Sequence, residues 1–214
     1  SLSQSPELGE LFIAPGNPGT LAYGNNVSVD WRQFVAMKDF CMNNRIDMVI
    51  VGPEEPLCKG LGDQFATDED LASFLLIGPS AKGAQLEGSK DFAKSFMMQH
   101  NIPTAAYRTF NANELEAAVD YLATVDGPYV LKADGLAAGK GVVILDTLAE
   151  AQQEMRSMLG DAKFGAASSR VVVEEFLAGM EFSVFAVTDG KSAVILPEAK
   201  DYKRIGEGDQ GPNT

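Results

Sequence analysis

The residues best suited to chemistry lie in a glycine-rich stretch, YVLKADGLAAGKGVVIL, at residues 129–145. This stretch sets two lysines and three glycines between two runs rich in β-branched and aromatic residues: Lys132, Gly135, Gly139, Lys140 and Gly141. Lysines neutralise phosphate charge, and the backbone N–H groups of a glycine loop can approach phosphate oxygens closely because no Cβ intervenes. The stretch is therefore either a phosphate-binding loop or a plain glycine-rich hairpin turn.

The spacing of the glycines excludes two familiar nucleotide-binding loops. A Walker A loop has four residues between its glycines, but here three residues separate Gly135 from Gly139, and Gly141 takes the place of the metal-binding Ser or Thr. A dinucleotide-binding loop opens a helix, whereas residues 142–145 are strand-like. We therefore expect a β-hairpin whose glycine-rich tip carries Lys140, with Lys132 on the strand that leads into it.

Other charged residues indicate which ligand this hairpin could bind. Lys90 lies in EGSKDFAK, and VVVEEFLAG is a predicted strand that ends in Glu174 and Glu175. Taken alone, the glutamate pair is more simply a solvated sheet edge. Together, these residues can hold a nucleotide triphosphate: Lys90 and Lys132 can contact the α- and β-phosphates, and the glycine loop can cover the β- and γ-phosphates. The EEFL backbone can form hydrogen bonds with adenine, and Glu181 can bind the ribose hydroxyls.

The first third of the chain alternates strand-like and helix-like segments. Residues 11–15 and 26–30 are predicted strands, and a helix is expected between residues 30 and 45. The apolar runs IDMVIVGPEEP and FLLIGPS are typical of strands buried on both faces, each ending in Gly-Pro. Strand–helix–strand order predicts a doubly wound parallel sheet, whose ligands bind at the carboxyl ends of the strands.

The remainder of the chain predicts an α+β unit. Helices are expected at residues 88–102, 111–125 and 147–159; the first has an apolar face with Phe92 and Phe96, and the others have caps at Asn111 with Glu114 and at Thr147. Strands are expected at residues 105–110, on both sides of the glycine loop, and from residue 170 onward with a turn at residues 189–190.

Composition limits the classes of partner. The net charge of −13 argues against a surface that tracks nucleic acid or anionic membrane, although a local lysine cluster can still hold a nucleotide. No apolar run approaches the about 20 residues of a membrane span. Two cysteines and a start without a basic segment favour the cytoplasm, with neither a disulfide framework nor a signal peptide.

Several motifs, in this order, resemble the ATP-grasp superfamily: Lys90, VLKADGLAAGKGVV, VVEEFLAGMEFSVFAVTDG and DYKRIGEGDQGPNT. Together with APGNPGT, VGPEEPL, GLGD and GPSAKGAQLEGSK, they resemble the glycinamide ribonucleotide synthetases within it, essentially from end to end. The resemblance implies an incomplete doubly wound N-terminal domain at residues 1–78. It also implies a partial ATP-grasp domain at residues 79–214, with a lid at about 104–173.

The resemblance also implies an activity. The expected enzyme is an ATP-dependent ligase of de novo purine synthesis that joins glycine to 5-phosphoribosylamine through glycyl phosphate, releasing ADP and phosphate. ATP and Mg²⁺ are the expected cofactors, and the glycine hairpin is expected to be a mobile lid that excludes water. Nucleic acid and membrane partners are not expected, and the oligomeric state stays open.

By resemblance, the ATP site comprises Lys90, Lys132, Gly135, Gly139, Lys140, Gly141, Glu174, Glu175, Phe176, Leu177 and Glu181. The residues expected toward phosphoribosylamine and glycine are Gly16, Asn17, Gly52, Pro53, Glu54, Asp201, Lys203, Arg204, Asn213 and Thr214. No catalytic residue and no metal ligand is assigned, because the family places the magnesium ligands on later strands.

Two departures from the family pattern leave alternatives open. The family's first strand and glycine-rich turn are not found before Ser1, and Thr214 stands inside a motif that continues in the family. The chain is therefore expected to be a fragment without turnover of its own. The alternatives are another ATP-grasp carboxylate–amine or carboxylate–thiol ligase, and a nucleotide-binding module that does not turn over.

Overall fold

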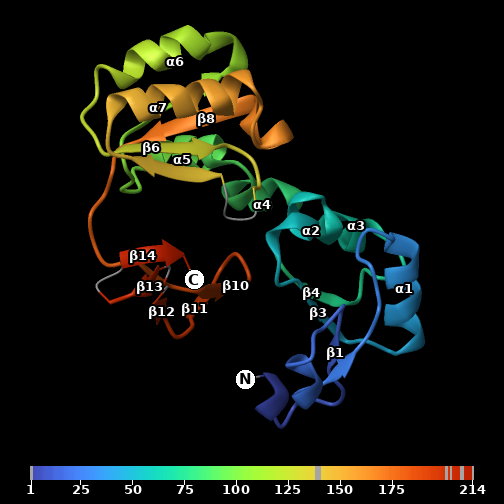
Figure 1. The fold of residues 1–214 in the computed structure, drawn as a ribbon. Helices are drawn as coiled ribbons and strands as arrows, with labels where there is room; N and C mark the ends of the chain where they lie inside the picture. Colours follow the sequence, from blue (N-terminus) through green and yellow to red (C-terminus); the bar gives the residue numbers. More distant parts are fainter. Residues whose placement is uncertain (1, 138–140, 201, 203, 208–209, 214) are drawn as a thin grey trace. The chain divides into compact units, whose positions relative to one another are not determined.

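A computed structural model describes residues 2–137, 141–200, 202, 204–207 and 210–213. The chain divides into two compact units, residues 1–175 and 176–214, which are described separately below (Figure 1). None of the helices in the described ranges is both long enough and apolar enough to cross a membrane.

The first part of the larger unit is built on parallel strand pairs. Its strands are β1 (Phe12–Ile13), β2 (Asn25–Asn26), β3 (Met48–Ile50) and β4 (Leu75–Ile77), and β1 pairs in parallel with β2 as β3 does with β4. Its helices are η1 (Leu2–Gln4), η2 (Thr20–Ala22), α1 (Phe34–Asn43), α2 (Glu54–Cys58), α3 (Leu61–Thr67) and α4 (Ala81–Gly88). The parallel pairing confirms the strand–helix–strand prediction for this part of the chain.

The prediction that these strands are buried on both faces is wrong for β3 and β4. Val49 and Leu76 pack against a core of Cys41, Leu61, Phe65 and Leu71. The alternate side chains of Met48, Ile50 and Leu75 remain about half exposed, at 47%, 48% and 50%. The apolar run was misleading because helices pack against one face of this strand pair, so alternation along the strand decides which side chains are buried.

The second part of this unit, from residue 88 to residue 175, is a four-stranded antiparallel sheet with helices. Its strands are β5 (Tyr107–Asn111), β6 (Tyr129–Ala133), β7 (Val142–Leu145) and β8 (Arg170–Glu174), in the order β5-β8-β6-β7. Its helical segments are α5 (Lys90–Gln99), η3 (Ala112–Glu114), α6 (Leu115–Leu122), α7 (Leu148–Met155), η4 (Arg156–Gly160) and η5 (Gly165–Ser169). In Figure 1, α6 and α7 lie on one side of this sheet.

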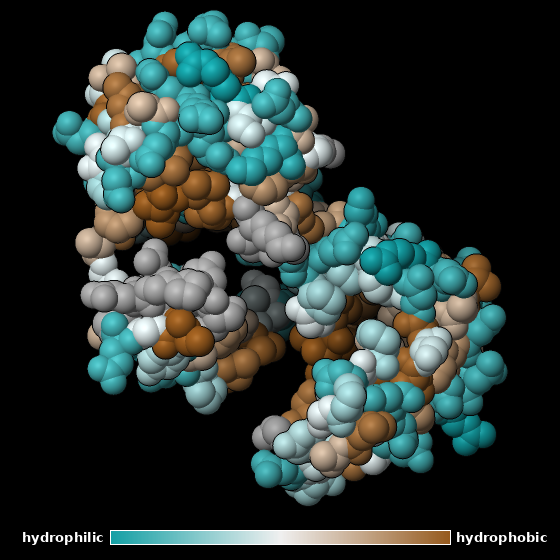
Figure 2. Space-filling view, viewed as in Figure 1, coloured by the Kyte–Doolittle hydropathy of each residue, from teal (hydrophilic) through white to brown (hydrophobic). Residues whose placement is uncertain are grey.

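The two faces of the sheet have different chemistry. Phe110, Leu131 and Val171 point into an apolar core with α6, α7 and η4, in which Leu122 and Met155 are also fully buried. The register places the alternate residues of the same strands on the opposite face, toward α5. The outer surface of α6 is mainly hydrophilic in Figure 2, as expected of an amphipathic helix that covers a core.

The helix caps predicted at Asn111 and Thr147 are confirmed. Asn111 and Glu114 form a capping box, and the Thr147 hydroxyl accepts a hydrogen bond from the Glu150 backbone amide at the start of α7. Ser89 caps α5 in the same way, through the amide of Phe92. These local bonds satisfy backbone amides that have no partner within the helix.

The smaller unit contains short antiparallel strand pairs. Its strands are β9 (Phe182–Ser183), β10 (Ala186–Thr188), β11 (Ala193–Ile195), β12 (Ala199–Lys200), β13 (Arg204–Gly206) and β14 (Gln210–Asn213). The predicted turn at residues 189–190 connects β10 to β11: Asp189 accepts two backbone hydrogen bonds and Gly190 has φ +85°.

Candidate functional site

The glycine-rich stretch forms the predicted β-hairpin. β6 and β7 pair in antiparallel register with Lys132 opposite Val142, so no helix follows the glycines. Two glycines allow close packing at the base: a Cβ on Gly141 would lie 2.8 Å from the Ala137 Cβ, and one on Gly135 would lie 3.1 Å from the Ala167 Cα. Gly139 and Lys140, which the sequence predicts for the tip, lie outside the described residues.

Two lysines share one carboxylate oxygen on the α5 side of the sheet. Lys132 pairs with Val172 across β6 and β8, so Glu174, two residues further along β8, lies diagonally opposite on the same face. The Nζ atoms of Lys132 and Lys94 each lie 3.0 Å from Glu174 Oε2. The side chains of Lys94 and Glu174 are both 7% exposed, whereas that of Lys132 is 26% exposed. Lys132 is therefore the ammonium that a ligand can reach.

Lys94 was not predicted as a site residue. Its Nζ also donates to Thr104 Oγ1 at 2.9 Å and to the Ala105 carbonyl at 3.0 Å, and it lies 5.6 Å from the centroid of the Tyr107 ring. The apolar pattern of α5 predicted Phe92 and Phe96 as its buried face, yet these are half-buried and Lys94 is the buried residue of the helix. The available signal was its position one helical turn after Lys90, on the same side of the helix.

Lys90, the first residue of α5, provides a second ammonium group. Its Nζ lies 3.4 Å from the Gly135 carbonyl oxygen, at the start of the glycine loop. Burial lowers the pKa of Lys90; the Asp134 carboxylate opposes this shift and the Lys132 ammonium adds to it. Within the described parts of the chain, no carboxylate lies at ion-pair distance from Lys90, so a bound anion would stabilise its charge.

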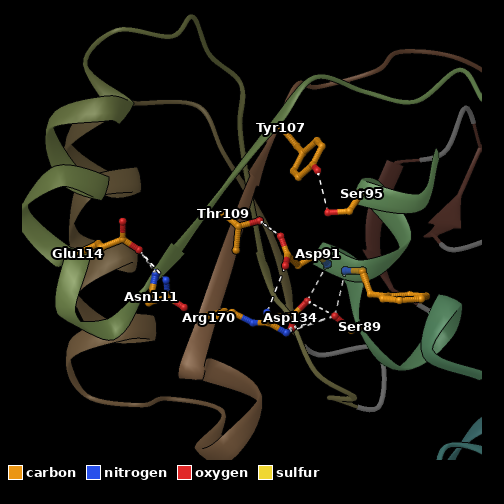
Figure 3. Close-up of polar contacts among 10 residues, drawn as sticks. Ser89, Asp91, Ser95, Tyr107, Thr109, Asn111, Glu114, Asp134 and Arg170 are labelled. Atoms are coloured by element: carbon orange, nitrogen blue, oxygen red, sulfur yellow. Dashed lines mark hydrogen bonds and ion pairs between the residues drawn. The ribbon is translucent and has the colours of Figure 1, made fainter. Parts of the chain in front are cut away.

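A buried carboxylate, Asp134, ties these elements together (Figure 3). It accepts hydrogen bonds from Ser89 Oγ at 3.1 Å and from the Asp91 amide at 2.8 Å, and it pairs with the Arg170 guanidinium. Arg170 also pairs with Asp91 at 3.2 Å, and Asp91 accepts from Thr109 Oγ1 at 2.6 Å. None of these residues was predicted for the site, because their proximity depends on tertiary packing between α5, β5, β6 and β8.

The end of β8 is held in the sheet. The Glu175 amide donates to the Ala106 carbonyl at 2.8 Å, and the Ala106 amide donates to Glu175 Oε2 at 3.1 Å. The Glu175 side chain therefore continues the pairing of β8 with the segment before β5. The other residues predicted for adenine and ribose lie in the smaller unit: Phe176, Leu177 and Glu181. The side chains of Phe176 and Leu177 are exposed.

The residues expected near the substrates of the N-terminal part lie in turns. Gly16 has φ +74°, and a Cβ there would collide with Asn26. Asn17 Oδ1 accepts from the Gly19 amide at 2.8 Å, so its side chain shapes the turn. The other predicted substrate residues of this part lie between β3 and the start of α2: Gly52, Pro53 and Glu54. Pro53 is the N-cap of α2.

The last group of predicted substrate residues lies near the C-terminal end of the sequence. Arg204 and Asn213 are register partners of the β13–β14 pair. Asp201, Lys203 and Thr214 lie outside the described residues. Across the described part of the chain, no group of three or more His, Cys, Asp or Glu side chains is placed to hold a metal ion.

Comparisons with family models and with known proteins agree on one family. Residues 1–87 match the N domain of phosphoribosylglycinamide synthetase, and residues 88–214 match its ATP-grasp (A) domain. The chain is 46% identical to a phosphoribosylamine–glycine ligase of Escherichia coli O6:H1, over 99% of this chain and 48% of the relative. The chain thus spans about half the length of the curated relatives that it matches.

Solved structures agree at the level of the fold. A crystal structure of phosphoribosylamine–glycine ligase from Thermotoga maritima superposes with a TM-score of 0.72 and 34% identity, over 96% of this chain and 47% of that one. An ADP complex of N5-carboxyaminoimidazole ribonucleotide synthetase, at 16% identity, shares the fold with a TM-score of 0.65 over 94% of this chain and 49% of that one. The parallel strand pairs, the lysine-bearing hairpin sheet and both domain matches lead to one conclusion: the chain belongs to the phosphoribosylglycinamide synthetase family.

Proposed function

We propose that the protein acts as an ATP-dependent ligase that joins glycine to 5-phosphoribosylamine. The observation that carries the proposal is the pair of ammonium groups, Lys90 and Lys132, at the base of a glycine-rich hairpin in a chain that matches two domains of the family. Such an arrangement suits a nucleotide triphosphate, because phosphoryl transfer depends on positioning and on charge neutralisation.

The reaction would proceed in two steps. A carboxylate oxygen of glycine attacks the γ-phosphorus of ATP, and ADP leaves. The amine nitrogen of phosphoribosylamine then attacks the carbonyl carbon of glycyl phosphate, expels phosphate and loses a proton. The glycyl phosphate hydrolyses readily in water, so the site must exclude solvent until the amine of phosphoribosylamine attacks.

The residues of this chain have separate tasks in that scheme. Lys90 and Lys132 neutralise the phosphates, and the hairpin from Gly135 to Gly141 covers them with backbone N–H groups. The residues in turns of the N-terminal part, with those of the β13–β14 segment, are proposed to contact glycine and phosphoribosylamine. Mg²⁺ would neutralise phosphate charge when it accompanies ATP.

Two further proposals accompany this function. The domain division is proposed at residue 78, with residues 79–214 forming the ATP-grasp part and a lid at about 104–173. The cytoplasm is the proposed compartment, because phosphoribosylamine and ATP are substrates of intracellular metabolism.

The test is a coupled assay of ADP release by the full-length protein. ADP should form only when glycine and phosphoribosylamine are both present. ADP formation that ignores phosphoribosylamine, or that accepts another amine equally well, would refute the proposed substrates. ATP binding measured by calorimetry without any ADP formation would instead support a nucleotide-binding module.

A further inference from the structure

The network around Asp134 fixes the start of α5 through three consecutive residues. Ser89 donates its hydroxyl to the Asp134 carboxylate at 3.1 Å, the Lys90 amide donates to the Asp134 carbonyl at 3.3 Å, and the Asp91 amide donates to the carboxylate at 2.8 Å. Asp134 itself lies two residues after Lys132. The backbone that carries Lys90 is thus bound directly to the segment that carries Lys132.

Arg170 completes this network from a third element. One guanidinium nitrogen pairs with Asp134 and the other with Asp91 at 3.2 Å, so a single side chain at the start of β8 bridges α5 and the end of β6 (Figure 3). Thr109 supports Asp91 from β5 with a hydrogen bond of 2.6 Å. A planar guanidinium presents separate N–H groups to the two carboxylates in a fixed geometry, whereas an ammonium group offers a single nitrogen.

The network is built to position rather than to bind. The Asp134 side chain is 6% exposed, and its carboxylate is occupied by Ser89, Asp91 and Arg170. Lys90, by contrast, has only a carbonyl oxygen at 3.4 Å as a described partner of its ammonium. We propose that Asp134 and Arg170 are positioning residues, which set the spacing between the Lys90 and Lys132 ammonium groups so that both can contact the phosphates of one nucleotide. This inference rests on the proposed function and adds to it the residues that preorganise the phosphate site.

A double-mutant cycle separates this role from a general contribution to stability. Calorimetry of the full-length protein measures the affinity for ATP and, by competition, for adenosine, which lacks phosphates. Arg170→Gln should weaken ATP binding by about tenfold and leave adenosine binding unchanged. The same change made in a Lys90→Met background should have less than about a twofold further effect, because no Lys90 ammonium is left to position. In a Lys132→Met background the effect of Arg170→Gln should shrink in the same way, because the spacing that Arg170 sets requires both ammonium groups.

Two further variants serve as controls. Arg108→Gln makes the same chemical change on β5, where the guanidinium stacks on the Phe110 and Tyr121 rings on the opposite face of the sheet, and should leave ATP affinity unchanged. Arg170→Lys keeps the charge but replaces the planar pair of nitrogens by a single nitrogen, and should lose most of the affinity that Arg170→Gln loses. An equal loss of ATP affinity with and without Lys90, or a parallel loss of adenosine affinity, would overturn the inference.

A second readout does not depend on nucleotide binding. The pKa of the Lys90 amine can be followed by NMR after ¹³C-methylation of the lysines. Because a loosened α5 terminus would be better hydrated, Arg170→Gln should move the pKa of Lys90 back toward its ordinary value, and Arg108→Gln should not. If the wild-type protein fails to bind ATP, the proposed function fails; an unchanged Lys90 pKa in Arg170→Gln would refute the role of Arg170 in fixing Lys90, whether or not ATP binds.

Discussion

Replacing Glu174 by glutamine removes the carboxylate that the Lys94 and Lys132 ammonium groups share. Both Nζ atoms lie 3.0 Å from the same oxygen, but their surroundings differ. Lys94 is 7% exposed and has no second carboxylate within ion-pair distance among the described residues, whereas Lys132 is 26% exposed and can be hydrated. Lys94→Met breaks the same ion pair but leaves the Glu174 carboxylate paired with the Lys132 ammonium.

These differences give an order of destabilisation. Removing one partner of a buried ion pair costs about 3–5 kcal/mol when the other charge is left uncompensated, and Glu174→Gln creates that situation at Lys94. Lys94→Met leaves no such charge, and its main loss is the hydrogen bonds to Thr104 and Ala105, about 2 kcal/mol in total. The double variant Lys94→Met/Glu174→Gln carries no buried Lys94 charge, so it should be more stable than Glu174→Gln alone.

Urea unfolding, followed by far-UV circular dichroism, measures the free energy of unfolding of each variant and so tests this order. Trp31 fluorescence is unsuitable as the main probe, because Trp31 packs against the Cys41 core and not against the sheet. Lys163→Met is the matched control: its ion pair with Glu154 is partly exposed, and its loss should change the free energy of unfolding by less than about 1 kcal/mol.

The double-variant result is decisive. If the losses of the two single variants simply add, the uncompensated Lys94 charge is not what destabilises Glu174→Gln, and the reasoning is wrong. A greater loss for Lys94→Met than for Glu174→Gln would likewise show that the uncompensated charge is not the dominant effect.

Three further predictions concern the core, a helix cap and Lys90. Leu131→Ala, at a fully buried position of β6, should lower the free energy of unfolding by about 2–5 kcal/mol in urea titrations, and a loss under 1 kcal/mol would mean that the site collapses around the cavity. Thr147→Ala should cost about 1 kcal/mol through loss of the α7 cap, with Thr147→Ser close to wild type; equal losses in both would assign the effect to the methyl group instead. Because burial lowers the pKa of Lys90 below 10.5 and only its charged form attracts phosphate, ATP affinity measured by calorimetry should fall as the pH rises through that lowered pKa. Lys90→Arg should remove this dependence, and a pH profile that is identical in Lys90→Arg would contradict it. The same shift affects stability: between the lowered pKa and 10.5 the unfolded chain holds more protons than the folded protein, so the free energy of unfolding rises with pH through this window, and at lower pH the buried Lys90 charge disfavours folding.

Local sequence rules predicted much of the fold. The capping box at Asn111, the cap at Thr147 and the hairpin around the glycine loop are all confirmed, because each depends on residues within a few positions of one another. The β3 and β4 strands were found but their exposure was wrong, because a continuous apolar run does not tell which face a helix will cover. The residues of the smaller unit predicted for ATP and substrates stay predictions.

The sequence by itself determined the order of elements, the family motifs and the two lysines proposed to contact phosphates, Lys90 and Lys132. Only the tertiary structure decided how these lysines are held. Lys94 meets Glu174 across 80 residues of chain, and Arg170 joins Asp134 to Asp91 across three elements. Such pairings follow from strand register and from the packing of α5 on the sheet, and neither is encoded in the local spacing of charged residues. A lysine in a helix looks like a solvated side chain until the fold places a buried carboxylate beside it.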